Sequence, residues 1–388
     1  MKKNKICLIM KNNSNWTGGS EYIKNILLSF SFLEKNERDK IEVYLISFES
    51  SLENDYLFLK NSDYYYSLRD FRNSFIRRFL FFINEKNKLI QFVYIAFILY
   101  SKKVNFAYPF PDYLKWIGLK SALWIPDFQH HYLRDFFSKD DIKKRNKKFR
   151  KIIDSTSKIV LSSEDSKRDL IKFYDINNKK IYVLNFRTNL NKDWLLENPI
   201  EISNKYNLPD KFFLVSNQFW KHKNHLLVLD ALNYLNIKKN ININIIMTGR
   251  LNKEKEFSKK IIDKIKEYKL KNQLFILGLI PKKDQFLLMR RSIAVIQPSL
   301  FEGWSTILEE TRSIGKNIIL SDLEVHKEQN YRNSIFFIKN SYLDLADKIE
   351  QTFYKIECGP NLLDEKKFSE ENSSLMKNFA KRFISLTN

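Results

Sequence analysis

The chain has 388 residues and a formal net charge of +22, and 44% of its residues are hydrophobic and 29% charged. This length suggests two domains that each bury a core, and the composition excludes wholesale disorder and a protein with many membrane spans. Two cysteines exclude a disulfide framework and a cysteine-rich metal site, while the basic excess favours an anionic partner: nucleic acid, lipid headgroups or phosphorylated substrates.

In the first half, short apolar runs alternate with longer amphipathic segments, the pattern of βαβ units around a parallel sheet. Strands are predicted at 5–10, 41–48, 122–126, 158–161 and 180–184, and helices at about 20–33, 141–154 and 163–173. The region 52–108 is predicted to be mostly helical. The apolar run 6–10 is too short for a signal-peptide core, and the run 89–100 is too short to span a bilayer, which takes about 20 residues.

A basic and aromatic stretch from 69 to 103 has two interpretations. Its basic and aromatic members include Arg72, Arg77, Arg78, Phe79, Phe81, Phe82, Lys102 and Lys103. The segment either lies on an anionic membrane surface or forms a buried helix with a solvated basic flank. The run 143–151 adds a second cluster of positive charge to the same half of the chain.

The second half shows the alternation more clearly. Strands are predicted at 212–216, 243–248, 274–277, 294–297, 317–320 and 334–337, with helices at 225–235, 255–268, 282–291, 306–314 and 342–354. The pattern predicts a doubly wound α/β domain at 205–358, after a polar linker and a first domain of the same class at 1–190. A terminal helix is predicted at about 366–386, within a third segment, 359–388.

In doubly wound sheets, ligands bind beyond the carboxyl ends of the strands, so the loops that follow strands are the candidate sites. The first such loop ends in Gly18 and Gly19, whose backbone could approach a phosphate at a helix N-terminus; a plain turn is the alternative. The loop 216–225 holds Lys223, which could neutralise a diphosphate. The loop 122–138 holds His130, a candidate for acid–base chemistry or hydrogen bonding, and it lacks zinc-ligand spacing.

The segment 298–316, PSLFEGWSTILEETRSIGK, follows a strand and opens a helix. Glu302 lies in the loop and Glu310 lies eight positions on, about two helical turns later. Free backbone N–H groups at Gly303, Trp304, Ser305 and Thr306 suit a diphosphate, and Glu310 could accept hydrogen bonds from sugar hydroxyls. The alternative is that both glutamates are ordinary residues of a helix surface.

Together these segments resemble the retaining nucleotide-sugar glycosyltransferases of family 4, also called group 1, which have the GT-B fold. The residues in register with that family's Glu-x7-Glu signature are Pro298, Ser299, Glu302, Gly303, Glu310 and Gly315. The resemblance implies two Rossmann-like domains facing a central cleft, with a C-terminal helix that returns to the first domain. No Asp-x-Asp motif is present, so no metal or cofactor is predicted besides the nucleotide diphosphate sugar that serves as donor.

The resemblance also implies residue roles. It places Glu302 and His130 at the reacting centre, on the donor and acceptor sides respectively. The implied donor-binding residues are Gly18, Gly19, Gln218, Lys223, Arg250, Gly303, Trp304, Ser305, Thr306 and Glu310. The chain departs from the family where Gln218 replaces an arginine, where Trp304 begins a different sequence after Glu-Gly, and where Pro126 replaces a histidine. Because Glu309 adjoins Glu310, the ribose role stays open between them.

The predicted function is retaining transfer of a hexosyl group to a polyprenyl-diphosphate-linked or saccharide acceptor, in the biosynthesis of O-antigen or capsule. The enzyme is expected to be cytoplasmic and peripherally bound to the inner face of an anionic membrane. The alternatives are another GT-B enzyme, such as a nucleotide-sugar epimerase or an inverting transferase, and a non-catalytic partner subunit. A basic nucleic-acid-binding protein is a further alternative, although no recognised binding module is present.

Overall fold

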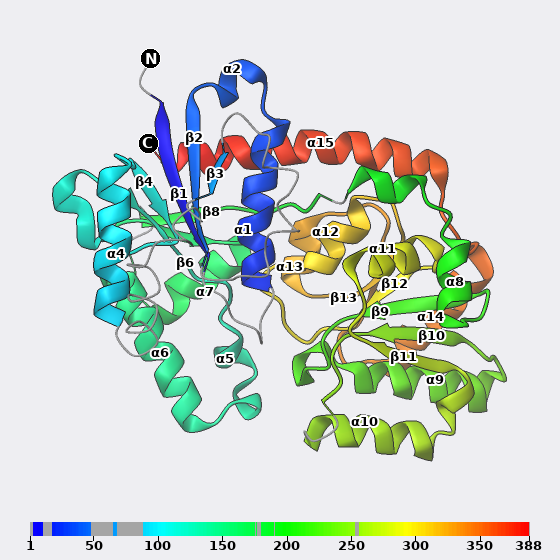
Figure 1. The fold of residues 1–388 in the computed structure, drawn as a ribbon. Helices are drawn as coiled ribbons and strands as arrows, with labels where there is room; N and C mark the ends of the chain where they lie inside the picture. The colour runs from blue at the N-terminus through cyan, green and yellow to red at the C-terminus, as the bar shows by residue number, and fades with distance from the viewer. Residues whose placement is uncertain are drawn as a thin grey trace.

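A computed structural model describes residues 3–10, 18–47, 65–67, 88–174, 176, 180–189, 191–252 and 256–387. The part of the basic stretch at 69–82 lies outside the described residues, as does most of the predicted helical region 52–108. The described chain forms two α/β domains that lie beside each other, and a long helix, α15, runs along both (Figure 1).

The first domain contains two parallel sheets. One has the strand order β3-β2-β1-β4-β5, and the other has the order β6-β7-β8. The strands are β1 (Asn4–Met10), β2 (Ile41–Ser47), β3 (Tyr65–Ser67), β4 (Phe106–Tyr108), β5 (Lys120–Ser121), β6 (Leu123–Trp124), β7 (Ile159–Leu161) and β8 (Ile181–Val183). The helices are α1 (Gly18–Ser29), η1 (Phe30–Phe32), α2 (Lys35–Arg38), α4 (Lys88–Ser101), η5 (Asp112–Ile117), α5 (Gln129–Tyr132), η6 (Arg134–Phe136), α6 (Lys139–Asp154) and α7 (Glu164–Tyr174).

The apolar run of β1 is buried on both faces of its sheet. Ile6, Leu8 and Met10 pack into one core cluster, while Cys7 and Ile9 pack into another beside α4. A continuous apolar run of this kind is typical of a parallel strand that helices cover on both sides. The predicted strand at 122–126 is instead the short strand β6 followed by an irregular segment, because Pro126 has no backbone N–H with which to extend a ladder.

The second domain is built on one six-stranded parallel sheet with the order β11-β10-β9-β12-β13-β14. Its strands are β9 (Phe212–Ser216), β10 (Asn244–Thr248), β11 (Leu274–Gly278), β12 (Val295–Gln297), β13 (Ile318–Ser321) and β14 (Ser334–Phe337). Its helices are η9 (Lys221–Lys223), α9 (His225–Lys239), α10 (Glu256–Glu267), η10 (Leu270–Asn272), α11 (Lys282–Arg291), α12 (Thr306–Arg312), α13 (Glu324–Gln329) and α14 (Tyr342–Lys355). This order reverses between β9 and β12, which makes that pair the switch point where ligands bind in doubly wound sheets.

The linker between the domains is more ordered than its polar composition predicts. It contains the short helices η8 (Lys192–Leu196) and α8 (Ile200–Tyr206), and Tyr206 donates a hydrogen bond of 2.5 Å to Asp284 of the second domain. Among the described residues, no helix has both the length and the apolar character that crossing a membrane requires.

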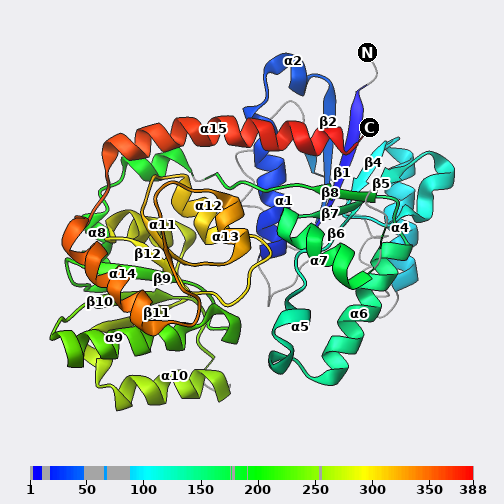
Figure 2. The same cartoon turned by 180° about the vertical axis from the view of Figure 1, so that it is seen from behind.

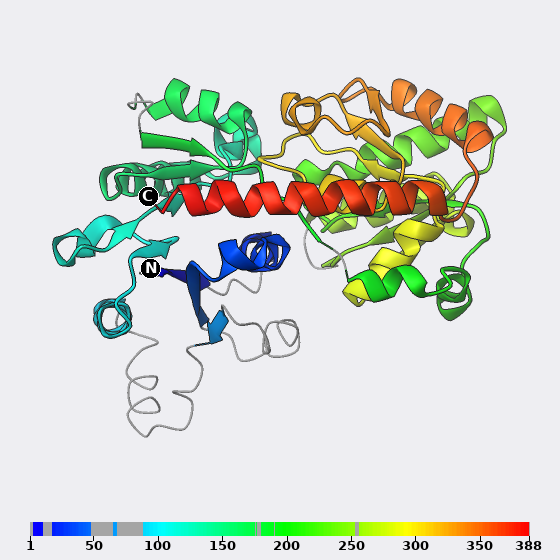
Figure 3. The same cartoon turned by 90° about the horizontal axis from the view of Figure 1, so that it is seen from above.

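Helix α15 (Leu362–Ser385) crosses from the second domain back to the first (Figure 2 and Figure 3). In the second domain, Glu365 accepts hydrogen bonds from the buried guanidinium of Arg290 at 2.7 and 3.0 Å. At the other end, Phe379 and Phe383 are buried in the core of the first domain, and Lys377 pairs with Glu34 at 2.6 Å. The prediction that the C-terminal helix returns to the first domain is therefore confirmed.

Candidate functional site

The candidate site forms where β9 and β12 end, because these neighbouring parallel strands deliver their loops to the same edge of the sheet. The loop after β9 turns into η9 and carries Lys223, and the loop after β12 carries Glu302. The Nζ atom of Lys223 lies 2.5 Å from Oε1 of Glu302. A backbone hydrogen bond of 2.8 Å from Leu300 N to the carbonyl of His222 holds the two loops in this register.

Glu302 is held as a carboxylate. Its Oε1 also accepts hydrogen bonds from Ser299 Oγ at 2.6 Å and from Gln297 Nε2 at 2.9 Å. Burial is the largest single influence and raises the pKa of Glu302, but Lys223, His222 and His326 together outweigh it, so the pKa lies below its ordinary value. The site therefore pairs one fixed negative charge with one fixed positive charge, and only 10% and 15% of these two side chains are exposed.

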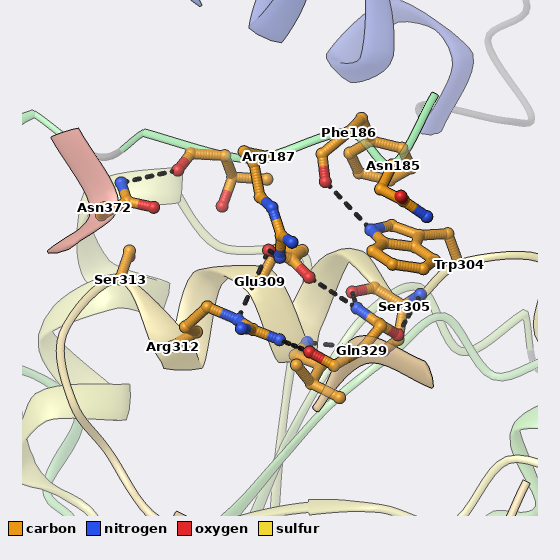
Figure 4. Close-up of polar contacts among 12 residues, drawn as sticks. Asn185, Phe186, Arg187, Trp304, Ser305, Glu309, Arg312, Ser313, Gln329 and Asn372 are labelled. Atoms are coloured by element: carbon orange, nitrogen blue, oxygen red, sulfur yellow. Dashed lines mark hydrogen bonds and ion pairs between the residues drawn. The ribbon is translucent and has the colours of Figure 1, made fainter. Parts of the chain in front are cut away.

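Glu309 and Glu310 leave α12 in different directions, as successive residues of an α-helix must. Glu310 accepts a hydrogen bond of 2.5 Å from Lys282, the first residue of α11. Glu309 accepts hydrogen bonds from Arg187 Nη1 at 2.7 Å and from Gln329 Nε2 at 2.8 Å (Figure 4). Glu309 therefore belongs to the contact between the linker and the second domain, and Glu310 is the one that lies against α11.

The Glu309 contact is part of a buried network at the hinge between the domains. Arg187 also lies over the Trp304 ring, with its guanidinium carbon 5.8 Å from the ring centroid. The indole N–H of Trp304 donates a 3.0 Å hydrogen bond to the carbonyl of Phe186 (Figure 4). The Trp304 side chain thus packs into the core of the first domain. Trp304 is also where the sequence begins to differ from the family signature, so this difference lies at a contact between the domains.

The backbone N–H groups predicted to bind diphosphate are not all free to donate to a ligand. Ser305 N already donates to Gln329 Oε1 at 3.0 Å, and Ser305 Oγ caps α12 by accepting from Leu308 N. Gly303 lies so close to the first domain that an added Cβ would be 2.1 Å from the carbonyl oxygen of Pro126. Glycine is therefore required at 303 by the contact between the domains.

The remaining predicted donor residues lie at the start of α1 and in the loops that follow β9 and β10. Gly18 and Gly19 are the first residues of α1, which stands on the side of the first domain that faces the second (Figure 1). Gln218 follows β9 and accepts a hydrogen bond of 3.0 Å from the backbone N–H of Arg250, which follows β10. Among the described residues, no group of three or more His, Cys, Asp or Glu side chains is placed to hold a metal ion.

The two neighbouring histidines of the first domain face inward. His130 is fully buried, and its Nε2 lies 3.1 Å from Asn146 Oδ1. His131 stacks on Phe173 at 4.0 Å, and burial lowers its pKa to about 4. The hydrogen bonds and ring contacts of both imidazoles go to residues of the first domain.

Asp127 is a carboxylate of the first domain that lies at the junction with the second domain. An added Cβ on Gly303 would lie 3.0 Å from the Asp127 Cβ, so the side chain starts at the interface. Burial and, to a smaller extent, the negative charge of Glu302 raise the pKa of Asp127; the backbone N–H of Gln129 and the charges of Arg145 and Lys223 offset only part of that increase. The sequence signal for this residue is its place directly after the predicted strand, in the loop 122–138.

Comparisons with known proteins agree with this architecture. Residues 199–355 match the model of a protein family described as "Glycosyl transferases group 1". A search of curated proteins found no match. Among solved structures, a glycosyltransferase from Rickettsia africae aligns with a TM-score of 0.66 at 18% identity, covering 100% of this chain and 98% of that one.

Two further structures show the same similarity over nearly the whole chain. Anabaena HepE, solved in complex with UDP and glucose, aligns with a TM-score of 0.64 at 13% identity, covering 98% of each chain. WaaG, a glycosyltransferase involved in lipopolysaccharide biosynthesis, aligns with a TM-score of 0.59 at 10% identity, covering 97% of this chain and 95% of that one. The predicted fold class, GT-B with two Rossmann-like domains, is therefore confirmed.

Proposed function

We propose that the protein is a retaining glycosyltransferase that moves a hexosyl group from a nucleotide diphosphate sugar to an acceptor hydroxyl. The observation that carries the proposal is the Lys223–Glu302 pair at the switch point of the second sheet, within the segment that matches the group 1 family model. The structure of HepE with UDP and glucose supports a nucleotide-sugar donor for a protein of this fold.

The chemistry requires stabilisation of charge on the departing diphosphate. In the proposed complex, Lys223 turns from Glu302 toward the diphosphate, where a buried ammonium stabilises the developing negative charge. Glu302 remains ionised and lies by the transferred sugar, where its charge stabilises a cationic anomeric centre. As the acceptor oxygen bonds to that carbon, the carbon–oxygen bond to the diphosphate breaks, and the hydroxyl proton leaves with the diphosphate. No metal is assigned a part in this scheme.

Glu310 is the proposed ribose-binding residue. Its carboxylate has a single described hydrogen-bond donor, Lys282, so it retains capacity to accept from the two ribose hydroxyls. Glu309 is less available, because each of its oxygens already accepts a hydrogen bond and its carboxylate pairs with the guanidinium groups of Arg187 and Arg312. These contacts favour Glu310 over Glu309 for the role that the sequence left open.

A thermal-shift screen of UDP-, GDP-, dTDP- and ADP-sugars tests the proposal, since a ligand that binds only the folded state raises its apparent stability. Replacing Glu310 with alanine is expected to raise the Kd of the selected donor about 10- to 100-fold, the effect of losing hydrogen bonds to a charged group. Calorimetric titration measures this Kd, and Glu324→Ala, an exposed glutamate on α13, is the control. An unchanged Kd in the Glu310 variant would contradict the proposed ribose-binding role of Glu310. A product of inverted anomeric configuration would contradict a retaining transfer.

We also propose a lipid-linked glycan or saccharide acceptor, with the enzyme in the cytoplasm at the inner face of the membrane. The support is a set of exposed apolar and basic side chains on η5 and on α4, which lies at the outer edge of the first domain (Figure 1); we call it the α4–η5 surface. Its exposed members are Val93, Phe97, Tyr100, Lys102, Lys103, Tyr113, Lys115 and Trp116. Exposed aromatic rings interspersed with lysines suit the interface of an anionic bilayer. A role in O-antigen or capsule synthesis agrees with the similarity to WaaG.

The α4–η5 surface predicts binding to anionic vesicles. Wild-type protein should float with phosphatidylglycerol vesicles and not with phosphatidylcholine vesicles. Replacing Phe97 and Trp116 together with glutamate is expected to abolish flotation, because it buries charge at the interface and reduces the positive potential. Leu363→Glu, at an apolar residue of α15 that is 83% exposed, is the matched control. Flotation that survives the double substitution would exclude this surface.

A further inference from the structure

Two loops meet at the junction between the domains, and each carries a carboxylate. The loop after β12 brings Glu302 and Gly303, and the loop after β6 brings Pro126 and Asp127. Because Gly303 has no side chain, the backbone at 303 packs directly against the carbonyl of Pro126. This close approach fixes Asp127 opposite the Lys223–Glu302 pair, on the side of the junction that the first domain supplies.

The carboxylate of Asp127 can accept a further hydrogen bond. Its Oδ1 accepts a hydrogen bond of 3.1 Å from the backbone N–H of Gln129, which orients the side chain. Within the described part of the chain, Oδ2 has no hydrogen-bond partner. Arg145, Glu302 and Lys223 are the charged groups that act on Asp127. A carboxylate oxygen in this position can accept a hydrogen bond from a ligand hydroxyl.

The imidazole of His130, by contrast, is buried within the first domain; its Nε2 is bonded, and its Nδ1 has no hydrogen-bond partner among the described residues. Asn146 holds its Nε2, and Phe149 contacts the ring edge-to-face at 5.3 Å, so the ring is part of the packing between α5 and α6. Moving His130 to the junction would break this packing. The loop that holds both residues therefore presents Asp127, and not His130, toward Glu302.

We propose that Asp127 binds the acceptor, by accepting a hydrogen bond from a hydroxyl of a saccharide placed against the donor sugar. The inference rests on the proposed function, because it takes the Lys223–Glu302 side as the donor side. The physical reason is complementarity: a hydroxyl-rich acceptor offers hydrogen-bond donors, and Asp127 is a carboxyl group that the Gln129 N–H orients beside the Lys223–Glu302 pair. Holding the acceptor hydroxyl near the anomeric carbon lowers the entropic cost of transfer.

The test compares transfer with hydrolysis of the same donor. Asp127→Ala and Asp127→Asn are assayed with the nucleotide sugar that stabilises the wild type most, using octyl glucoside, galactoside and mannoside as acceptor probes. The kcat/KM for the octyl glycoside is expected to fall about 10- to 100-fold in both variants, as for the loss of a hydrogen bond to a charged group. Release of the sugar to water and the thermal shift caused by the donor should stay within about twofold, because neither depends on the acceptor.

Asp135→Asn, an exposed aspartate in the same loop region, is the control and should leave every rate unchanged. Unchanged transfer in both Asp127 variants would overturn the inference. A loss of the donor thermal shift in those variants would also overturn it, because Asp127 would then act on the donor or on folding. Failure of the proposed function gives a different result, in which no nucleotide sugar stabilises even the wild type.

Discussion

Replacing Lys223 with alanine is expected to slow sugar transfer about 100- to 1,000-fold, the usual effect of removing one group that stabilises developing negative charge in a buried site. Lys223 is a cation in the loop that follows β9, and its ammonium lies 2.5 Å from Glu302. Its removal leaves the diphosphate without that charge and leaves Glu302 uncompensated. Steady-state assays with the selected donor measure the effect, which should fall mainly on kcat.

Lys348→Ala is a matched control, because Lys348 also pairs with an acidic residue, Asp344, but lies on α14 away from the switch point. It should leave transfer unchanged. A Lys223 variant with wild-type kcat would show that the diphosphate is neutralised by another group, for which Arg250, after β10, and Lys221, after β9, are the candidates. The Lys223→Arg variant should recover part of the rate if charge alone is required.

Replacing Glu309 with alanine is expected to lower the free energy of unfolding by about 3–5 kcal/mol, the range for breaking a buried ion pair from one side. Glu309 is 1% exposed, and its carboxylate is the partner of Arg187 at 2.7 Å and of Arg312 at 3.6 Å. Its removal would leave two guanidinium groups close together without their counter-charge. Denaturation in urea, followed by tryptophan fluorescence, measures the change.

Glu324→Ala gives the comparison for an exposed ion pair, whose loss usually costs about 0–1 kcal/mol. Glu309→Gln should fall between the two, since an amide keeps hydrogen-bonding capacity but loses the charge. If Glu309→Ala were as stable as the wild type and instead lost donor affinity, Glu309 rather than Glu310 would have to be the ribose-binding residue.

The order of strands and helices was largely predictable, because the apolar runs of a parallel sheet are short, continuous and separated by amphipathic helices. Each predicted strand of the second domain corresponds to an observed strand with small shifts at the ends. The strands β3, β4 and β5 and the helices of the linker were not predicted; β3 and β4 lie in the region 52–108, which was expected to be mostly helical. Tertiary contacts, such as that of Tyr206 with Asp284, decide whether such weakly patterned segments become ordered.

The candidate site was predictable in its residue types and only partly in its geometry. The spacing of Glu302 and Glu310 indicated two carboxylates near one helix N-terminus, but sequence spacing does not say which of Glu309 and Glu310 faces the linker. That choice depends on where Arg187 and Gln329 lie, and these residues come from other parts of the chain. His130 and Asp127 were likewise indistinguishable in position, since both follow the same strand.

The sequence by itself determined the alternation of strand and helix, and with it a doubly wound architecture whose loops carry Lys223 and the Glu302–Glu310 segment. These are local properties, set by hydrophobic period and by the few glycines. Only the tertiary structure decided that β9 and β12 are neighbours, that Gly303 meets Pro126, and that Asp127 lies opposite Glu302. Such pairings join residues that are far apart in the chain, and they follow from how the domains and α15 bury their shared apolar surface, which no short stretch of sequence encodes.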